Sequence, residues 1–361
     1  MDSLKNARTK INEIDAKMAE LFTERMKAAA EIAEYKKERG LPIYDKARED
    51  EVILKNSALV EEEEIREFYV NFLKSNMSIS RAWQERLISG MKVAYSGVEG
   101  AFAHIATGKL FPTAKKVAYP DFLTAYRAVE EGECDVAVLP VENSYNGEVG
   151  QVTDLMFSGS LYITGMLDLA VSQDLLGVPG ATISDIKEVI SHPQALAQCA
   201  QYIREMGFIE REFSNTALAA REVATRGNKS LAAIASAEAA KIFGLEVLQR
   251  NVNASRQNTT RFAIFARAEN KHRSSETGAH SIFFFTVRNE AGALAKAIEI
   301  IGKHGFNMLS LRSRPMKELL WQYYFYVEAE GNINTEDGTE MMKELSKYCD
   351  RLKSVGTYIH K

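Results

Sequence analysis

Cysteine, proline and net charge are all scarce in this 361-residue chain. Its three cysteines, Cys134, Cys199 and Cys349, are far apart, so we expect neither a disulfide framework nor a zinc site. The 45 Lys and Arg nearly balance the 49 Asp and Glu, which argues against a nucleic-acid or membrane-surface protein. No apolar run approaches the roughly 18 residues of a membrane helix, and the N-terminus lacks the apolar core of a secretory signal. These absences predict a cytoplasmic protein, and the length of 361 residues predicts two or three domains.

Glycine is nearly missing from the first quarter of the chain. Only Gly40 and Pro42 interrupt the first 89 residues, so we expect a separate all-helical domain over residues 1–90. Its first helix, residues 4–39, carries an apolar seam at alternating spacings of three and four. The seam consists of Leu4, Ala7, Ile11, Ile14, Met18 and Leu21. Such a helix would extend for about 54 Å, too long for a monomeric domain to cover, so we expect the seam to contact a second chain.

Arg25 occupies a position in this seam where an apolar residue is expected. A buried cation needs an anion. At about 100° per residue, Lys36 projects from nearly the same face as Arg25, whereas Arg8 points about 100° away and would join them only from a partner subunit. The pattern predicts a site for an anionic ligand. The alternatives are an internal ion pair for Arg25 and solvated positions for the other two cations.

Eight polar residues of this segment stand in the order and spacing of substrate-contacting positions in all-helical chorismate mutases that form intertwined dimers. They are Arg8, Arg25, Lys36, Asp45, Arg48, Glu49, Ser80 and Gln84. The segment therefore resembles that family, which rearranges chorismate to prephenate without a nucleophile or cofactor. The resemblance implies that Arg25 and Arg8 of the partner subunit hold the carboxylates in a compact conformer. It also implies that Lys36 and Gln84 face the ether oxygen, where negative charge grows.

Residues 91–270 change in texture, because short β-branched runs alternate there with amphipathic stretches. This alternation is typical of an α/β domain, here expected to have two lobes. Polar clusters follow its strands, where open α/β sheets bind ligands. They begin at Ser96, Glu142, Ser191, Asn215 and Ser236. One such cluster is more often a helix cap or a turn, but five of them favour a ligand cleft.

Three short segments of this domain carry a second resemblance: residues 142–144 (ENS), 191–194 (SHPQ) and 258–262 (NTTRF). Together they resemble prephenate dehydratases, which form phenylpyruvate, carbon dioxide and water from prephenate in a cleft between two lobes. The resemblance implies Thr260 as the donor to the leaving hydroxyl, directly or through water. Arg261 is implied as a ligand for a substrate carboxylate, with a structural ion pair as the alternative. Further implied cleft positions are Asn143, Ser144, Ser191, Gln198 and Glu238.

Two positions depart from the dehydratase pattern. The family has Thr where this chain has Ala101, and Ser where it has Ala103. The first loop of the expected cleft therefore lacks two hydroxyls, which we expect to change its affinity for a carboxylate.

After a polar linker at residues 270–280, the expected element order is β-α-β-β-α-β, the ferredoxin-like plan. Gly292-Ala293-Leu294 opens its first helix and Ser313-Arg314-Pro315 ends its second strand. These features resemble ACT regulatory domains, in which the two segments bind phenylalanine at a subunit interface. Arg312 stands where that motif usually has Glu, which places a cation beside the expected ligand. The alternative is a dimerisation module without a ligand.

Across its whole length the chain resembles the bifunctional chorismate mutase/prephenate dehydratase family. The resemblance implies an all-α domain at 1–90, an α/β two-lobed domain at 91–270 and an α+β ferredoxin-like ACT domain at 278–361. It implies chorismate and prephenate as substrates, phenylalanine as an effector, no metal or organic cofactor, and a homodimer or larger homo-oligomer. Two alternatives remain open. One is a dehydratase whose helical segment only dimerises, and the other is a non-catalytic protein that binds a small carboxylate.

Overall fold

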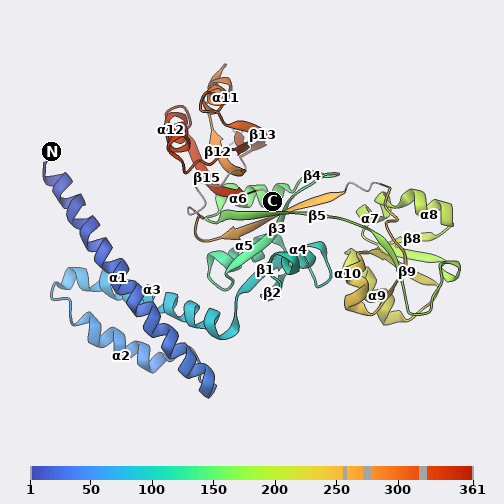
Figure 1. Ribbon diagram of the computed structural model, residues 1–361, viewed down its shortest axis with the longest axis horizontal. Coiled ribbons are helices and arrows are strands. Elements are labelled where there is room, and N and C mark those ends of the chain that lie inside the picture. The colour runs from blue at the N-terminus through green and yellow to red at the C-terminus, as the bar shows by residue number, and fades with distance from the viewer. Residues whose placement is uncertain (1, 255–257, 271–277, 317–322, 360–361) are drawn as a thin grey trace. The chain divides into compact units, whose positions relative to one another are not determined.

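The chain folds into two compact units, Met1–Met91 and Lys92–Lys361. Figure 1 presents the computed structural model, which describes residues 2–254, 258–270, 278–316 and 323–359. Most of the expected linker, residues 271–277, lies outside the described residues. No helix in the described ranges combines the length and the apolar character needed to cross a membrane.

The first unit is helical throughout its regular structure, as predicted. It contains α1 (Asp2–Arg39), α2 (Lys46–Ser57) and α3 (Glu63–Ser89). Gly40 follows α1 at a φ of +63°, a left-handed conformation that suits glycine after a helix. Asp45 caps α2 by accepting a hydrogen bond from the backbone N of Arg48 at 3.1 Å.

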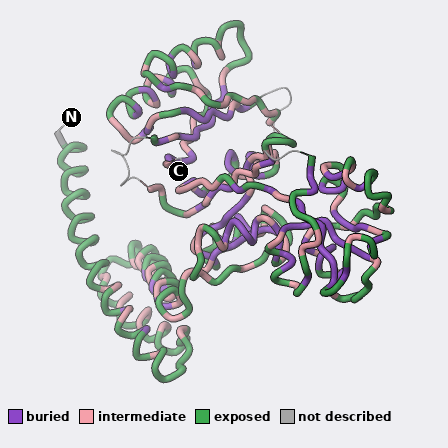
Figure 2. Tube along the Cα trace, turned by 45° about the vertical axis from the view of Figure 1, so that its right-hand side comes forward, coloured by how far each residue is buried: buried purple, intermediate pink, exposed green. Residues whose placement is uncertain are grey.

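The seam predicted on α1 is divided into a covered and an uncovered part. Beyond Arg25, α1 packs against α3 and buries Ala29 and Ala33. Before Arg25, the seam is open to solvent within this chain, with Leu4 61% and Leu21 64% exposed. Figure 2 shows this N-terminal stretch as exposed along its length. A second chain covering it stays a prediction.

Two sheets form the central part of the second unit, and each belongs to one lobe. The first sheet has the order β2-β1-β3-β11-β5, with β4 added to β3. Its strands are β1 (Lys92–Ser96), β2 (Lys115–Tyr119), β3 (Val136–Asn143), β4 (Gly147–Glu148), β5 (Tyr162–Ala170) and β11 (Thr259–Ala266). The lobe also contains α4 (Phe102–Leu110), α5 (Phe122–Glu130) and α6 (Gly150–Ser158).

The second sheet has the order β10-β6-β9-β7-β8. Its strands are β6 (Asp174–Gly177), β7 (Glu188–Ser191), β8 (Ile209–Glu212), β9 (Leu231–Ala235) and β10 (Glu246–Gln249). Its helices are η1 (Ile183–Asp185), α7 (Pro193–Gln198), α8 (Ala200–Met206), α9 (Thr216–Arg226) and α10 (Ala237–Phe243). The chain crosses between the lobes twice, after β5 and before β11. The predicted two-lobed α/β architecture is confirmed, and both crossings lie where a cleft between lobes would form.

The C-terminal part has the predicted β-α-β-β-α-β order and forms an antiparallel sheet in the order β13-β14-β12-β15. Its elements are β12 (Ala279–Thr286), α11 (Ala293–Lys303), β13 (Asn307–Pro315), β14 (Tyr323–Glu330), α12 (Glu336–Leu345) and β15 (Arg351–Ile359). One face of this sheet packs against α11 and α12 around Phe283 and Phe285. The other face places Phe284 and Tyr326 in the same core as Leu139 of β3. This ACT-like sheet therefore shares a continuous hydrophobic core with the first lobe.

Candidate active sites

A groove of about 600 Å³ in the first unit gathers most of the residues predicted there. Among those lining it are Arg25, Lys36, Asp45, Arg48, Glu49, Ser80 and Gln84. Arg8 does not line the groove of its own chain, because it lies on the exposed N-terminal stretch of α1. Seven of the eight residues that the resemblance implied therefore lie around one groove of mixed charge.

Two half-buried cations, Arg25 and Lys36, enter the groove from one face of α1, as their spacing predicted. Arg25 donates to the hydroxyl of Ser80 and, at 3.4 Å, to the backbone carbonyl of Asn76 on α3. Lys36 donates its Nζ proton to the carbonyl of Ile43, at 2.5 Å. Neither contact is with a carboxylate, so both cations keep charge available for an anion.

Gln84 is 7% exposed, and its Oε1 has no hydrogen-bond partner among the described residues. An unpaired buried polar atom costs about 1–3 kcal/mol, so a ligand that pairs with this side chain would relieve the cost. Sequence reasoning missed Arg81, which lines the same groove and forms an ion pair with Glu49. Arg81 lies three residues before Gln84 on α3, and this spacing places both side chains on the same face of the helix. That spacing could have identified Arg81 from the sequence.

In the second unit, two cavities of about 250 Å³ each lie at the crossings between the lobes, and Phe102 lines both. Thr260, Asn143 and Gln198 line the first cavity, and Glu238 lines the second. Of the described residues around the first cavity, none carries a fixed charge, because its polar lining consists of amides, hydroxyls and His192. Toward a substrate in this cavity, these side chains would act mainly as hydrogen-bond donors and acceptors.

Thr260 and Asn143 are paired across β11 and β3. The Oδ1 of Asn143 accepts the backbone N–H groups of Tyr145 and Asn146, at 3.0 Å each, which fixes the orientation of the amide. Its Nδ2 therefore faces Thr260 and donates to Oγ1 at 2.8 Å. Because the hydroxyl of Thr260 is an acceptor in this contact, its own proton is left to donate elsewhere.

A line of amides connects the two lobes beside this pair. Asn143 also donates to Oδ1 of Asn258 at 2.8 Å, and Asn258 donates to Oε1 of Gln198 at 3.1 Å. Asn258 lies on the second crossing and Gln198 on the second lobe. The structure thus places side chains of both lobes and the connection between them around Thr260.

Other predicted residues lie elsewhere. Ser191 is fully buried and donates to the carbonyl of Ile234 at 2.5 Å, so it serves the second sheet and does not line either cavity. Ser144 is exposed and accepts from the backbone N of Thr259 at 2.9 Å. Glu238 is exposed and lines the second cavity, which shares Phe102 with the first.

Arg261 does not line the cavity of Thr260. Successive side chains on a strand point to opposite faces, and Arg261 forms ion pairs with Asp168 at 3.2 Å and with Glu328 of β14 at 3.1 Å. Burial disfavours its charged form, yet Glu328 and its other anionic neighbours raise the pKa of Arg261 above its usual value. Of the two roles considered for it, the arrangement favours the structural ion pair.

Gln173 is a cavity residue that sequence reasoning missed. It lies on the first crossing and is 3% exposed, and its Oε1 has no partner among the described residues. Its neighbours in the cavity come from distant parts of the chain, so no local spacing signalled it. Ala101 and Ala103, the two departures from the dehydratase pattern, are both buried, and Ala101 precedes α4 without a capping side chain.

The segments expected to bind phenylalanine follow β12 and end β13. Both strands pair antiparallel with β14, where Phe325 faces Phe285 of β12 and Ser313 of β13, so β12 and β13 finish at the same end of the ACT-like sheet. Gly292, at a φ of +85°, precedes α11, followed by half-buried Ala293 and Leu294. Ser313 and Pro315 are exposed on the edge strand β13. Arg314 is half-buried and donates to Asp154 of α6 at 3.0 Å. Arg312, expected beside the ligand, instead forms an ion pair with Glu142 of β3.

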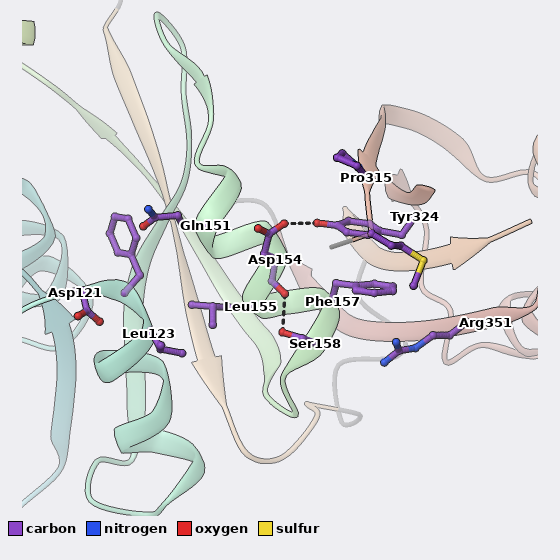
Figure 3. Close-up of a pocket in the computed structure, with 12 residues that line it drawn as sticks. Asp121, Leu123, Gln151, Asp154, Leu155, Phe157, Ser158, Pro315, Tyr324 and Arg351 are labelled. Atoms are coloured by element: carbon purple, nitrogen blue, oxygen red, sulfur yellow. Dashed lines mark hydrogen bonds between the residues drawn. The ribbon is translucent and has the colours of Figure 1, made fainter. Parts of the chain in front are cut away.

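A larger cavity of about 710 Å³ lies between α5, α6 and the ACT-like strands. Figure 3 shows the ring of Tyr324 over Phe157 and its hydroxyl directed toward Asp154, to which it donates at 2.6 Å. The two rings stack at 4.1 Å, and Arg351 lies 4.5 Å from the centre of the Phe157 ring. Of the predicted residues, Pro315 alone lines this cavity in the described ranges.

Comparison with known families matches residues 7–85 to chorismate mutase type II and residues 93–270 to prephenate dehydratase. A bifunctional chorismate mutase/prephenate dehydratase from Aquifex aeolicus is 32% identical over 99% of this chain and 98% of its own length. An arogenate dehydratase/prephenate dehydratase from Arabidopsis thaliana is 33% identical over 75% of this chain and 73% of its own.

Among solved structures, the prephenate dehydratase of Arthrobacter aurescens in complex with L-Phe is 25% identical, with a TM-score of 0.68. The match covers 75% of this chain and 90% of that one. Both family matches fall on the segments that hold the two candidate sites, and the relative from Aquifex aeolicus extends over nearly the whole chain. The chain therefore belongs to the bifunctional chorismate mutase/prephenate dehydratase family.

Proposed function

We propose that this chain catalyses two consecutive steps of phenylalanine biosynthesis, an isomerase step from chorismate to prephenate and a lyase step from prephenate to phenylpyruvate. The observation that carries the proposal is the presence of two chemically different sites in separate units. The groove of the first unit is lined by several cations, whereas the cavity around Thr260 is lined by uncharged polar groups. The domains we assign are residues 1–90, 91–270 and 278–361.

The groove suits a pericyclic rearrangement of a dicarboxylate. Arg25 would bind one carboxylate, and Arg8 of the partner subunit would bind the other, holding the substrate in its reactive conformer. Lys36 and the buried Gln84 would stabilise negative charge on the ether oxygen of the transition state. Asp45, Arg48, Glu49 and Ser80 would complete the lining. This assignment requires a homodimer, and the uncovered seam of α1 supports one.

The cavity around Thr260 suits loss of a ring hydroxyl. Thr260 would donate its free proton to the departing hydroxyl while decarboxylation supplies electrons to the ring. Asn143 fixes the Thr260 hydroxyl, and Gln198 would hold the substrate from the second lobe. Gln173, with its unpaired buried Oε1, joins these as a substrate contact. Arg261, Ser191 and Ser144 would support the cleft from outside it, and Glu238 would act from the neighbouring cavity.

Phenylalanine is the proposed effector. A structure of the relative from Arthrobacter aurescens holds L-Phe, and this chain carries the Gly292-Ala293-Leu294 and Ser313-Arg314-Pro315 segments. Titration calorimetry with millimolar phenylalanine should give a binding isotherm, and the absence of heat would contradict this assignment. An aliphatic amino acid such as alanine serves as the control ligand.

A time course with chorismate at neutral pH tests the whole proposal. Purified protein with chelator and no added cofactor should produce phenylpyruvate through transient prephenate, measured against an enzyme-free blank. Prephenate without phenylpyruvate would leave a mutase with an inactive cleft, and Ala101 and Ala103 would then be the residues to restore to Thr and Ser. Unchanged chorismate, with prephenate turned over, would favour a dehydratase whose helical segment only dimerises. No turnover of either compound would favour a non-catalytic carboxylate-binding protein.

A further inference from the structure

The short hairpin that carries Asn143 has an electrostatic weakness. It is formed by the end of β3 and by β4, a strand of only two residues. Its register places Glu142 directly opposite Glu148. Like charges opposite each other on neighbouring strands destabilise a sheet, so this hairpin needs cations from outside to hold its shape.

The edge strand of the ACT-like sheet supplies those cations. Arg312 forms an ion pair with Glu142, and Arg314 contacts Glu148 at 3.4 Å. The two arginines are separated by one residue on β13, so they project from the same face of the strand at the spacing of one pleat repeat. Both are half-buried, whereas Ser313 between them is exposed. Each glutamate of the hairpin therefore contacts one arginine of the ACT-like sheet.

Glu142 also faces the strand that carries Thr260. Its second carboxylate oxygen lies 4.0 Å from Arg261, which in turn binds Glu328 through both carboxylate oxygens, at 3.1 and 3.2 Å. The side chain of Glu328 is 3% exposed. Ion pairs withdrawn from solvent are more sensitive to loss of one partner than surface pairs are. Charges of alternating sign thus run from Arg312 through Glu142 and Arg261 to Glu328.

The two central residues of this row, Glu142 and Arg261, are sequence neighbours of two cavity residues. Glu142 precedes Asn143, and Arg261 follows Thr260, so the charged row lies on one face of β3 and β11 while the Asn143–Thr260 contact lies on the other. A shift of Glu142 would move Asn143 with it. Misplacement of a reacting group by about 1 Å can lower a rate about 100-fold.

We propose that Arg312 and Glu142 are positioning residues for the dehydratase reaction. Arg312, from the regulatory sheet, holds Glu142 so that the neighbouring Asn143 keeps the hydroxyl of Thr260 aimed into the cavity. The inference rests on the proposed function of that cavity. It also gives the cation at position 312 a role in this chain, since Arg312 pairs with Glu142.

The test uses steady-state kinetics of the full-length protein with prephenate. The variants are R312Q, E142Q and the double variant. R312K is added to ask whether a positive charge alone maintains kcat for prephenate. R288Q is the matched control, because Arg288 pairs with Glu290 on an exposed part of the same domain. Chorismate turnover of every variant reports the first unit, and thermal unfolding reports the integrity of the second.

We expect R312Q and E142Q each to lower kcat for prephenate about 10-fold, as misplacement of a group that acts in the transition state would. KM should change less than about twofold, because binding of the substrate itself is retained. The double variant should be no slower than E142Q, since Arg312 acts through Glu142. R312K should recover part of the loss, and R288Q should match the unsubstituted protein.

Unchanged kcat and KM in R312Q and E142Q would overturn the inference, as would losses that multiply in the double variant. A fall in kcat that merely tracks the fraction of unfolded protein would also overturn it, because it would assign the pair a purely structural role. No prephenate turnover by the unsubstituted protein would overturn the proposed function, and this inference with it. Turnover that the substitutions leave unchanged would overturn the inference alone.

Discussion

The hydroxyl of Thr260 is oriented by a single amide. Asn143 uses its oxygen to accept two backbone N–H groups of the hairpin loop and its nitrogen to donate to Thr260. A hydroxyl that accepts from a fixed donor directs its own proton away from that donor. The hydrogen bonds of Asn143 thus set the direction in which the hydroxyl proton of Thr260 points. The proposed donation of this proton to the departing hydroxyl of the substrate requires such a fixed direction.

Replacing Thr260 by Val removes this donor while keeping the β-branched shape. We expect kcat for prephenate to fall about 100-fold or more, the usual contribution of a positioned proton donor. Chorismate turnover should be unchanged, because the groove proposed for that step lies in the other unit. Phenylpyruvate formation measured by absorbance would check this. Thr164→Val on β5 is the control for loss of a strand hydroxyl, and equal activities of the two variants would contradict the role of Thr260.

Arg25 gives the corresponding residue-scale test in the first unit. Arg25→Ala removes a half-buried guanidinium that no described carboxylate neutralises, so we expect chorismate turnover to fall about 100-fold or more. Arg25→Lys should recover little, because a point charge cannot replace a planar two-donor fork. Prephenate consumption by both variants serves as the internal reference. Normal chorismate kinetics in Arg25→Ala would refute the assignment of the groove.

At the scale of elements, α1 is one helix with two different surroundings. Its C-terminal part packs on α3 within the chain, whereas its N-terminal seam leaves Leu4, Ile11 and Leu21 exposed. Hydrophobic burial contributes about 25 cal/mol per Å², so a heptad-spaced apolar stripe of this length favours association. The occupant we expect is the same helix region of a second copy, because the proposed site takes its Arg8 from a partner subunit.

Ile14→Glu places a charge in the middle of this seam. We expect the variant to dissociate, with sedimentation velocity reporting a smaller species, and to lose chorismate turnover together with the partner's Arg8. Ala16→Glu is the matched control, since residue 16 lies on the opposite side of the helix from the seam. Dissociation of both variants, or of neither, would argue against a dimer formed along this stripe.

A second element-scale contact joins α6 to the ACT-like sheet. Lys353 of β15 donates to the carbonyls of Met156 and Phe157, at 2.6 and 3.1 Å, and to that of Gly159. These carbonyls lie at the C-terminal end of α6, where the helix dipole favours a cation. Burial, with a smaller effect from Arg351, nevertheless lowers the pKa of Lys353 from 10.5 to about 8.

This lowered pKa predicts a pH dependence of stability. Between pH 8 and 10.5 the unfolded chain keeps the Lys353 proton that the folded chain releases, so the unfolding free energy gains a contribution that rises with pH. Below pH 8 both states are protonated and the contribution is constant. Urea midpoints of the second unit, followed by circular dichroism, should therefore rise relative to Lys353→Arg across that window. A constant difference between the two proteins from pH 7 to 10 would contradict the assignment.

On the scale of the whole molecule, the two activities are proposed to lie in units with separate cores. The groove proposed for the mutase step is lined by α1, α2, α3 and the segment between α1 and α2, and the cavity proposed for the dehydratase step is lined by residues of the second unit. The second unit is itself continuous, since the first lobe and the ACT-like sheet share one core. Phenylalanine, the proposed effector, is therefore expected to act on the dehydratase step more strongly than on the mutase step.

Mixing two inactive variants tests this independence. Arg25→Ala should turn over prephenate only, and Thr260→Val chorismate only, so neither should make phenylpyruvate from chorismate alone. We expect an equimolar mixture to form phenylpyruvate after a lag, because prephenate released by one protein is taken up by the other. Chromatographic quantification of the three compounds would follow this. A mixture that accumulates prephenate without phenylpyruvate, although Arg25→Ala alone consumes added prephenate, would show that Thr260→Val does not release its prephenate to solution.

Features that depend on local spacing could be predicted from the sequence. The helical seam, the common face of Arg25 and Lys36, and the element order of the three domains all follow from periodicities of 3.6 and 2 residues. These periodicities are set by backbone geometry, so they survive without knowledge of distant neighbours. Asn143 was likewise marked by its place at the end of a strand, whereas Thr260 was implied by the resemblance to prephenate dehydratases.

Only the tertiary structure decided which face each polar residue occupies. Arg261 lies outside the cavity and pairs with Glu328, 67 residues away along the chain. Ser191 donates to a carbonyl of the second sheet, whereas Gln173 lines the cavity. Strand pairing sets these choices, because a shift of one residue sends a side chain to the opposite face of a sheet. The pairing of β11 with β3 contains such a shift between Arg261 and Phe262. The sequence by itself thus determined the elements and the segments that hold the candidate residues, and long-range pairing determined which of these residues meet, since contacts between distant strands leave no local pattern.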